Sequence, residues 1–168
     1  MYNTIFSNKD MLELQNLLIK HNKSLTSAES CTGGLVASMI TEISGSSDIF
    51  NGSIITYSNK IKEQELNVKK KTLEDYGAVS IQVVEEMLHG VIEKFDADFA
   101  IAISGIAGPK GGTKEKPVGT VVIGVKGRNI DKEIDVYEFK GSRKEVQIQA
   151  AKYSLKKLFK FFQKSLDK

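Results

Sequence analysis

Apolar residues recur at helical spacing in several stretches of this 168-residue chain, with polar residues between them. Ser7 and Ser80 precede two of these stretches, and serine is a favoured N-cap residue. The pattern predicts helices at residues 8–21, from residue 32 or 33 to near Gly45, at residues 59–66, from Ser80 through Val91, and at residues 143–164. Residues 72–77 are expected to form a turn or a short helical piece.

Between these helices lie short segments rich in β-branched and other apolar residues, which are typical of strands. Strands are predicted at residues 24–28, 53–57, 99–104, 118–125 and 133–139, with residues 46–52 as a loop. Residues 99–104 are apolar without interruption, as in a strand buried on both faces. The alternation predicts an α/β fold, a three-layer α/β/α sandwich around a mixed β-sheet, with residues 1–168 as a single domain.

The composition is that of an ordinary globular protein, with 40% hydrophobic and 27% charged residues. The net charge of +3 favours a small anionic substrate and is too weak to indicate nucleic acid. Cys31 is the single cysteine, so no intramolecular disulfide forms and no cluster of cysteine and histidine ligands is expected to hold a metal. Without a signal sequence or an apolar run of bilayer length, we expect a cytoplasmic protein that does not enter membranes.

The segment at residues 27–34 combines small and hydroxyl residues with a double glycine at a predicted strand-to-helix junction. Backbone N–H groups without helical partners point outward at such a junction, and the helix dipole favours negative charge there. The junction can therefore bind a phosphate, or stabilise an oxyanion beside a serine nucleophile. We take Ser30 as that nucleophile. The alternative is that Ser30 or Thr32 is only a helix N-cap.

Cys31 is a second candidate nucleophile, or else a small buried apolar residue. A cysteine hydrolase usually needs a histidine partner. The chain contains only His21 and His89, and both lie in helical patterns without a recognisable motif. Ser30 is therefore favoured over Cys31.

Tyr57 and Lys62 are the candidate proton-transfer groups for such a serine. Tyr57 ends a predicted strand, and Lys62 lies in the first turn of the next helix. The positive end of that helix, burial and the neighbouring Lys60 would all lower the pKa of the Lys62 ammonium. A neutral lysine can act as a general base. The alternative is that Lys60 and Lys62 are two solvated lysines.

A glycine-rich loop follows the most buried predicted strand, and ligands of α/β sheets gather beyond the carboxyl ends of strands. Its sequence fits neither the Walker loop nor the dinucleotide-binding fingerprint. Its far end is expected to be a surface connection, and its first part to contact substrate: Ser104, Gly105, Ile106, Ala107 and Gly108. Arg143 opens the last helix and can pair with a phosphate, or serve as an ordinary first-turn residue.

Taken together, these motifs resemble the CinA C-terminal domain family over nearly the whole chain. The resemblance is carried, in order, by AESCTGG at residues 28–34, GSS at 45–47, YSN at 57–59 with Lys62, GAVS at 77–80, SGIAGP at 104–109, GG at 111–112 and EKPVGTV at 115–121. Several long motifs in the right order make this resemblance specific.

The resemblance implies a nicotinamide-nucleotide amidase that hydrolyses nicotinamide mononucleotide to nicotinate mononucleotide and ammonia, in pyridine nucleotide recycling. The family's catalytic residues fall on Ser30, Tyr57 and Lys62. Contacts to the nucleotide substrate are expected from Cys31, Thr32, Gly33, Gly34, Asn59, the Ser104–Gly108 loop and Arg143.

The chain resembles the stand-alone form of the family, which lacks the N-terminal domain of many members. No cofactor is expected, and a homodimer is the oligomer considered. Two alternatives to the amidase remain open at this stage. One is a catalytically silent, competence- or damage-related ligand-binding or interaction module. The other is an amidase for a different small amide.

Overall fold

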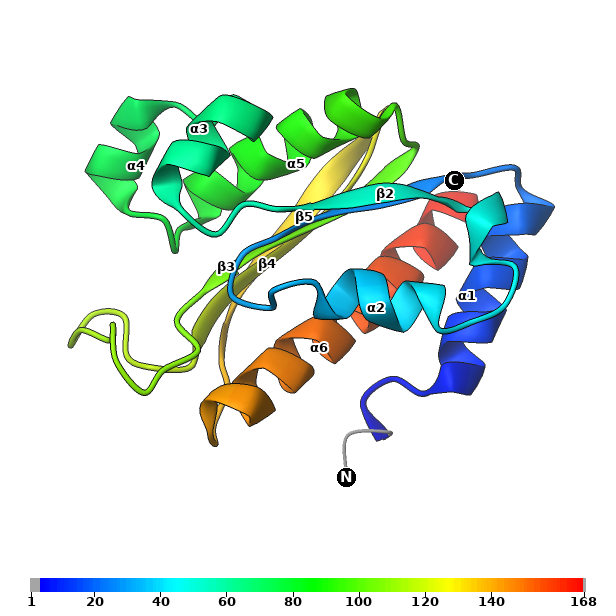
Figure 1. Ribbon diagram of the computed structural model, residues 1–168. Coiled ribbons are helices and arrows are strands. Elements are labelled where there is room, and N and C mark those ends of the chain that lie inside the picture. Colours follow the sequence, from blue (N-terminus) through cyan, green and yellow to red (C-terminus); the bar gives the residue numbers. More distant parts are fainter. Residues whose placement is uncertain (1–3, 168) are drawn as a thin grey trace.

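A computed structural model describes residues 4–167 and places a mixed five-stranded sheet between two layers of helices (Figure 1). The elements follow one another as α1 (Asn8–Lys20), β1 (Leu25–Glu29), α2 (Leu35–Thr41), the short 3-10 helix η2 (Ser46–Asp48), β2 (Phe50–Ile55), α3 (Asn59–Leu66), α4 (Lys70–Tyr76), α5 (Ile81–Phe95), β3 (Phe99–Gly105), β4 (Thr120–Gly127), β5 (Ile130–Glu138) and α6 (Arg143–Leu166).

The sheet has the strand order β2-β1-β3-β4-β5. β1 runs parallel to β2 and β3, whereas β4 is antiparallel to both β3 and β5. Strands covered by helices on both faces are apolar without alternation, and β1 and β3 are buried along almost their whole length. The predicted mixed sheet and three-layer sandwich are confirmed.

Each face of the sheet has its own core. On one face α1, α2 and α6 pack against the larger side chains of β3, such as Ile101 and Ile103. On the other face α5 packs against the smaller Ala100 and Ala102. At Gly124 of β4 a Cβ would lie 2.8 Å from α5 side chains, so the absence of a side chain lets α5 approach closely. This close packing sets the position of α5, against which α3 packs.

The predicted helices at residues 8–21, 59–66 and 143–164 are confirmed, and each end lies within two residues of the predicted one. The helix predicted from Ser80 through Val91 is also confirmed, and it continues to Phe95. Ser7 and Ser80 cap α1 and α5 as expected. The prediction for α2 was wrong at its start, because Gly33 and Gly34 take left-handed φ angles of 58° and 104° and the helix begins only at Leu35.

Among the strand boundaries, the starts of β2 and β5 differ most from the prediction. β2 begins at Phe50 rather than Ser53, although Asn51 and Gly52 are typical turn residues. Phe95 of α5 packs over Gly52, where a Cβ would lie 2.7 Å from its ring, and pairing with β1 keeps the segment extended. β5 begins at Ile130 because pairing with β4 continues to that residue. Tertiary pairing here overrides the local turn preference.

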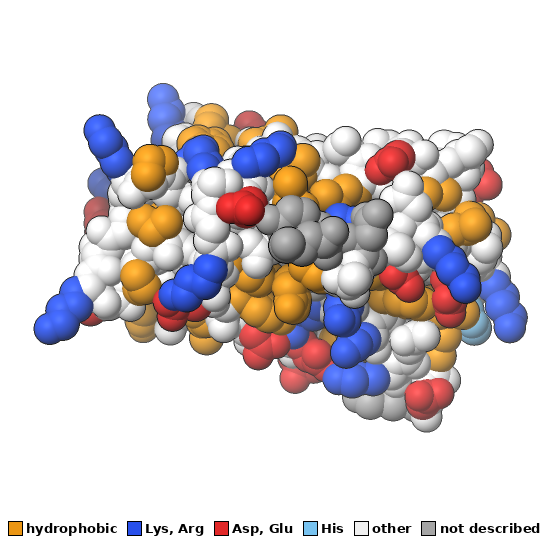
Figure 2. All heavy atoms as spheres, turned by 90° about the horizontal axis from the view of Figure 1, so that it is seen from below, with side chains coloured by type: hydrophobic (Ala, Val, Ile, Leu, Met, Phe, Trp, Pro, Cys, Tyr) orange, Lys and Arg blue, Asp and Glu red, His pale blue; other side chains and the backbone are white. Residues whose placement is uncertain are grey.

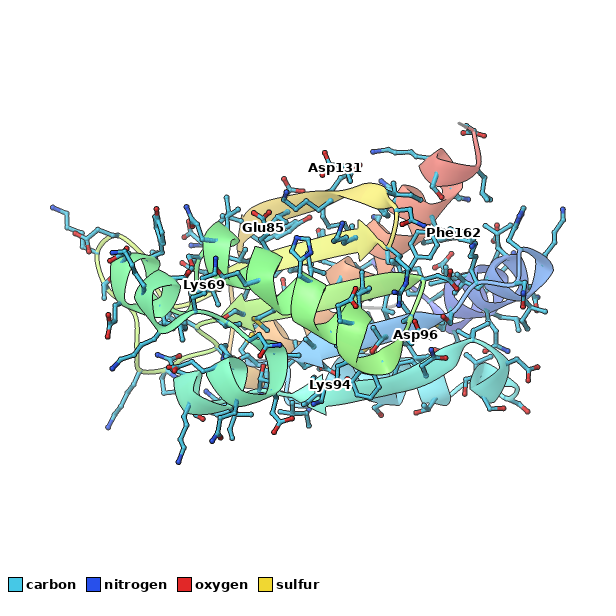
Figure 3. The ribbon with its side chains drawn as sticks, turned by 90° about the horizontal axis from the view of Figure 1, so that it is seen from above. Lys69, Glu85, Lys94, Asp96, Asp131 and Phe162 are labelled. Atoms are coloured by element: carbon cyan, nitrogen blue, oxygen red, sulfur yellow. The ribbon has the colours of Figure 1, made fainter. Side chains whose placement is uncertain are left out.

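Ion pairs tie the outer face of α5 to neighbouring elements (Figure 3). Glu85 lies 2.8 Å from Lys132 of β5, and Lys94 lies 2.7 Å from Glu65 of α3. Figure 2 shows the opposite side of the molecule, where the described lysine and arginine side chains are interspersed with carboxylates. Solvent-exposed pairs of this kind contribute little to stability, so the two cores dominate the fold.

None of the helices within residues 4–167 combines the length and apolar character needed to cross a membrane. The same described residues contain no group of three or more histidine, cysteine, aspartate or glutamate side chains placed to hold a metal ion.

Candidate active site

Ser30 lies in a tight turn at the carboxyl end of β1 and is mostly buried. The Gly33 N–H donates to the Ser30 carbonyl at 3.0 Å, which closes the turn. Left-handed glycines then reverse the chain into α2. The nucleophile candidate is therefore held by a strand on one side and a closed turn on the other.

Glu29, which the sequence analysis did not single out, holds this turn from below. Its carboxylate is fully buried. It accepts hydrogen bonds from Thr32 Oγ1 at 2.7 Å and from the backbone N–H groups of Gly34 at 3.1 Å, Val36 at 3.0 Å and Ala37 at 3.0 Å. A buried carboxylate is stable here because these donors and the positive end of α2 compensate its charge. The available sequence signal was a glutamate at the end of a strand of uncharged residues, shortly before a helix.

The Glu29 bonds change the expected role of the glycine pair. Gly34 N–H is committed to Glu29, and Gly33 N–H to the Ser30 carbonyl. Neither of these two glycine N–H groups is therefore free to bind a ligand in this structure. Within residues 4–167, the N–H of Cys31 has no backbone or carboxylate acceptor, and it directly follows the serine.

Lys62 reaches Ser30 from the first turn of α3. Its side chain is 1% exposed, and its Nζ lies 3.1 Å from Ser30 Oγ and 2.6 Å from the Thr56 carbonyl oxygen. Burial lowers the pKa of Lys62 to about 8, against a smaller opposing effect of the Cys31 thiol. This is the direction predicted from the sequence, and of the three predicted causes the desolvation by burial, rather than Lys60 or the helix end, lowers the pKa.

Gly90 in the middle of α5 allows α3 to lie where Lys62 needs it. A Cβ at Gly90 would lie 2.1 Å from the carbonyl oxygen of Leu66, the last residue of α3. Glycine is unfavourable inside a helix relative to alanine. We infer that its place in α5 reflects the close approach of the α3 backbone.

Tyr57 has a different environment from Lys62, with a side chain that is 59% exposed. Its hydroxyl oxygen accepts a hydrogen bond from Arg143 Nη2 at 2.7 Å. Arg143 Nη1 donates to the Gly108 carbonyl, also at 2.7 Å. Among the hydrogen bonds of the described residues, none joins the Tyr57 hydroxyl to Ser30 or Lys62.

These groups meet in an open cavity of about 250 Å³. Its lining consists of Ser30, Cys31, Tyr57, Lys62, Ala78, Val79, Ser104, Gly105, Ile106, Ala107, Gly108, Lys110, Gly111 and Arg143. Three lining residues are cationic and none is a carboxylate. Among the expected contact residues, Thr32, Gly33, Gly34 and Asn59 lie outside this lining, whereas Ala78, Val79, Lys110 and Gly111 are lining residues that the sequence analysis missed.

Ser104 anchors one wall of the cavity. Its hydroxyl donates to the carbonyl oxygen of Ala78 at 2.8 Å, and its side chain is buried. This bond ties the end of β3 to the segment between α4 and α5 and explains why Ala78 and Val79 line the cavity. Ala78 and Val79 come from a turn whose spatial neighbour is not evident from sequence spacing, whereas Lys110 and Gly111 belong to the far end of the glycine-rich loop.

Cys31 is buried, and burial raises the pKa of its thiol to about 12. The thiolate is the nucleophilic form of cysteine. A thiol that stays protonated near neutral pH cannot compete with a serine that contacts a lysine. The geometry therefore favours Ser30 over Cys31.

Comparison with known proteins identifies the family of this chain. The model of the CinA C-terminal domain matches residues 8–162. This chain belongs to the CinA C-terminal domain family. A family member named "Nicotinamide-nucleotide amidohydrolase PncC", from Enterobacter agglomerans, is 50% identical over 141 residues, which cover 84% of this chain and 86% of that protein. A "CinA-like protein" from Prochlorococcus marinus (strain MIT 9312) is 52% identical over 132 residues, which cover 79% of this chain but only 31% of that longer protein.

Solved structures of CinA proteins share the fold. A CinA superfamily protein from Klebsiella pneumoniae superposes with a TM-score of 0.89 at 32% identity, covering 94% of this chain and 98% of that chain. The competence/damage inducible protein CihA from Agrobacterium tumefaciens has a TM-score of 0.86 at 38% identity, covering 92% and 96% of the two chains. The three-layer arrangement is thus that of the CinA family.

Proposed function

We propose that this protein is an amidohydrolase that converts nicotinamide mononucleotide into nicotinate mononucleotide and ammonia. The observation that carries the proposal is the buried Lys62 amine, 3.1 Å from the hydroxyl of Ser30. A base in contact with a serine is the arrangement required for a serine nucleophile. The similarity to a protein named as a nicotinamide-nucleotide amidohydrolase supports the substrate.

Lys62 is the base in this mechanism, and not Tyr57. A lysine with a pKa of about 8 is partly neutral at physiological pH and then has a lone pair for the serine proton. The remaining N–H groups of the neutral amine can keep the bond to the Thr56 carbonyl oxygen. Tyr57 lies in the cavity wall, and its hydroxyl oxygen is held by Arg143.

In the first step Ser30 Oγ bonds to the carboxamide carbon while its proton passes to Lys62 Nζ. The carbonyl electron pair moves to oxygen and gives a tetrahedral oxyanion. The Cys31 N–H, next to the nucleophile, is the backbone donor that we assign to this oxyanion. Lys62 then returns the proton to the amide nitrogen, the C–N bond breaks, and ammonia leaves an ester on Ser30.

In the second step water attacks the ester and gives a proton to Lys62. The second tetrahedral intermediate collapses, the C–O bond to Ser30 breaks, and Lys62 returns the proton to Ser30 Oγ. The product is the carboxylic acid, which ionises to nicotinate mononucleotide. Each step uses only the substrate, water and groups that line the cavity.

The electrostatics of the cavity suit a nucleotide substrate. Its lining includes Lys62, Lys110 and Arg143 without a carboxylate, which favours a phosphate group. At Gly111 a Cβ would have Ile106 as its nearest neighbour, at 3.6 Å, so the backbone there is open, whereas Gly105 and Gly108 let their loop pack closely against Val121 and Val118. We propose that the Ser104–Gly108 loop and Cys31 contact the nucleotide, and that the reaction serves pyridine nucleotide recycling in the cytoplasm.

Ammonia release from nicotinamide mononucleotide by purified protein tests this function, with Ser30→Ala as the comparison. Release by the native protein alone supports both the reaction and its nucleophile. Release from another small amide, but not from the mononucleotide, would replace the substrate. Binding of the mononucleotide without release from any amide would indicate a ligand-binding module.

A further inference from the structure

One guanidinium joins three chain segments at the mouth of the cavity. Arg143 is the first residue of α6, Tyr57 lies between β2 and α3, and Gly108 lies in the loop between β3 and β4. Figure 1 shows the start of α6 beside that loop. The two bonds from Arg143, to Tyr57 Oη and to the Gly108 carbonyl oxygen, are both 2.7 Å long. An arginine side chain can hold two acceptors at once because its N–H donors form a rigid fork.

The direction of these bonds determines what Tyr57 can do. Arg143 can only donate, so the tyrosine oxygen is the acceptor and its own hydrogen remains available. No other hydrogen bond of the Tyr57 hydroxyl is found among the described residues. A donated bond from a cation also polarises the O–H group and makes it a stronger donor. The exposed tyrosine thus presents a hydrogen-bond donor to the cavity that it lines.

The same bonds bear on the expected role of Arg143 in binding phosphate. Bidentate recognition of a phosphate uses a fork of two parallel N–H groups. In this structure both terminal nitrogens of Arg143 already donate to protein oxygens. Lys110, in contrast, lines the cavity on an exposed loop and is not part of any ion pair found within residues 4–167. Two of the five N–H donors of Arg143 are thus used within the protein, whereas no hydrogen bond or ion pair of the Lys110 amine is found among the described residues, so we expect Lys110 to be the main cation for an anionic group.

We propose that Arg143 is a positioning residue, which acts through Tyr57 and Gly108 rather than by contact with the phosphate. It directs the Tyr57 hydroxyl toward the bound carboxamide nucleotide and holds the loop at residues 105–111 against the cavity. The proposal rests on the amidase function for its kinetic test, and it has a second test that needs no substrate.

The kinetic test compares Arg143→Ala, Tyr57→Phe and the double variant, with nicotinamide mononucleotide as substrate. Arg143→Ala is expected to lower kcat about tenfold and to change KM less than about threefold, since the lost bonds are charged but solvent-facing. The double variant is expected to lose no more than about threefold beyond the worse single variant, because both changes remove one interaction. Multiplicative losses, or a tenfold rise in KM with kcat unchanged, would overturn the proposal.

Arg143→Lys keeps the charge without the fork, so we expect it to recover only part of the lost kcat. Lys144→Ala is the matched control, because Lys144 is exposed in the same helical turn and does not line the cavity. A native kcat in Arg143→Ala, or full recovery by lysine, would contradict the positioning role of the fork.

The second test is the rate of tryptic cleavage after Lys110, followed by mass spectrometry. Loss of the bond to Gly108 should free the loop and raise this rate several-fold in Arg143→Ala. Tyr57→Phe and Lys144→Ala should be cleaved at the native rate, because both keep that bond. An unchanged rate in Arg143→Ala would overturn the proposed hold on the loop. If the native protein releases no ammonia, the amidase function fails, whereas this measurement still decides about the loop.

Discussion

Lys62 and Tyr57 are close neighbours in the chain and line one cavity, but their environments differ. Lys62 is 1% exposed and contacts Ser30, whereas Tyr57 is 59% exposed and contacts Arg143. The buried side has low polarity, which lowers the pKa of a lysine and favours proton transfer. In our proposal the exposed side meets the ligand and is held in place by the hydrogen bond from Arg143. We therefore expect the buried groups to do the chemistry and the exposed groups to position the ligand.

The largest expected effect is on the buried side, at the nucleophile. Ser30→Ala should lower kcat at least about 10⁴-fold, since no other hydroxyl among residues 4–167 bonds to the Lys62 amine. The assay is ammonia release under saturating nicotinamide mononucleotide. Ser38→Ala, on the exposed face of α2, is the control and should retain native activity. Comparable activity in both variants would exclude Ser30 as the nucleophile.

Loss of the base should be nearly as severe, and it should change the pH dependence. Lys62→Met should lower kcat about 10³-fold, within the range for general bases. In the native protein kcat/KM should rise with pH and level off above about 8, because only the neutral amine accepts the serine proton. Lys60→Met is the matched control, since Lys60 is exposed on the same helix. A native profile that is flat from pH 6 to 9 would contradict Lys62 as the base.

The same substitution, which lowers activity, is expected to raise stability. The folded pKa of Lys62 is about 8 and the ordinary value is 10.5, so between these values the unfolded chain binds the proton that the folded chain lacks. Native stability should therefore rise with pH across this window. Lys62→Met lacks the effect and should raise the free energy of unfolding at pH 7 by up to about 3 kcal/mol. Urea unfolding at pH 7 and pH 10 tests whether this gain shrinks.

Glu29→Gln should lower kcat about 10²-fold by loosening the turn that holds Ser30. The side-chain amide of glutamine would bring an NH₂ group against the backbone N–H groups that now donate to the Glu29 carboxylate. Two donors would then face each other, and a buried N–H group would lose its acceptor. We expect KM to change little, because Glu29 does not line the cavity. Glu42→Gln at the exposed end of α2 is the control. An unchanged kcat would show that the Glu29 charge is not needed to hold the turn.

The smallest of these effects is expected at Gly90, which lies outside the cavity. Gly90→Ala should lower stability by about 1–3 kcal/mol, because its methyl group would collide with the Leu66 carbonyl and displace α3. The displaced helix moves Lys62, so kcat should fall about tenfold. His89→Ala, an exposed neighbour on α5, is the control for both measurements. A stabilised variant would mean that helix preference outweighs the contact.

The site was predictable from sequence where one local pattern fixed both structure and chemistry. The segment around Ser30 combined a buried strand, hydroxyl residues and glycines, and these placed the serine correctly at the end of β1. The same pattern misled at the start of α2, since Gly33 and Gly34 allow either a helical or a left-handed backbone. The carboxylate of Glu29 selects the second form, and this contact was not evident from the spacing.

The sequence alone predicts the order of helices and strands, the mixed three-layer fold and the membership of the CinA family. The reason is that apolar periodicity predicts the elements and long local motifs identify the family. The tertiary structure decided the environments. Lys62 is buried beside Ser30, Tyr57 is exposed, and Arg143 donates hydrogen bonds to Tyr57 and Gly108. The physical reason is that burial and long-range hydrogen bonds depend on how distant elements pack, and lysine and tyrosine side chains are compatible with either environment.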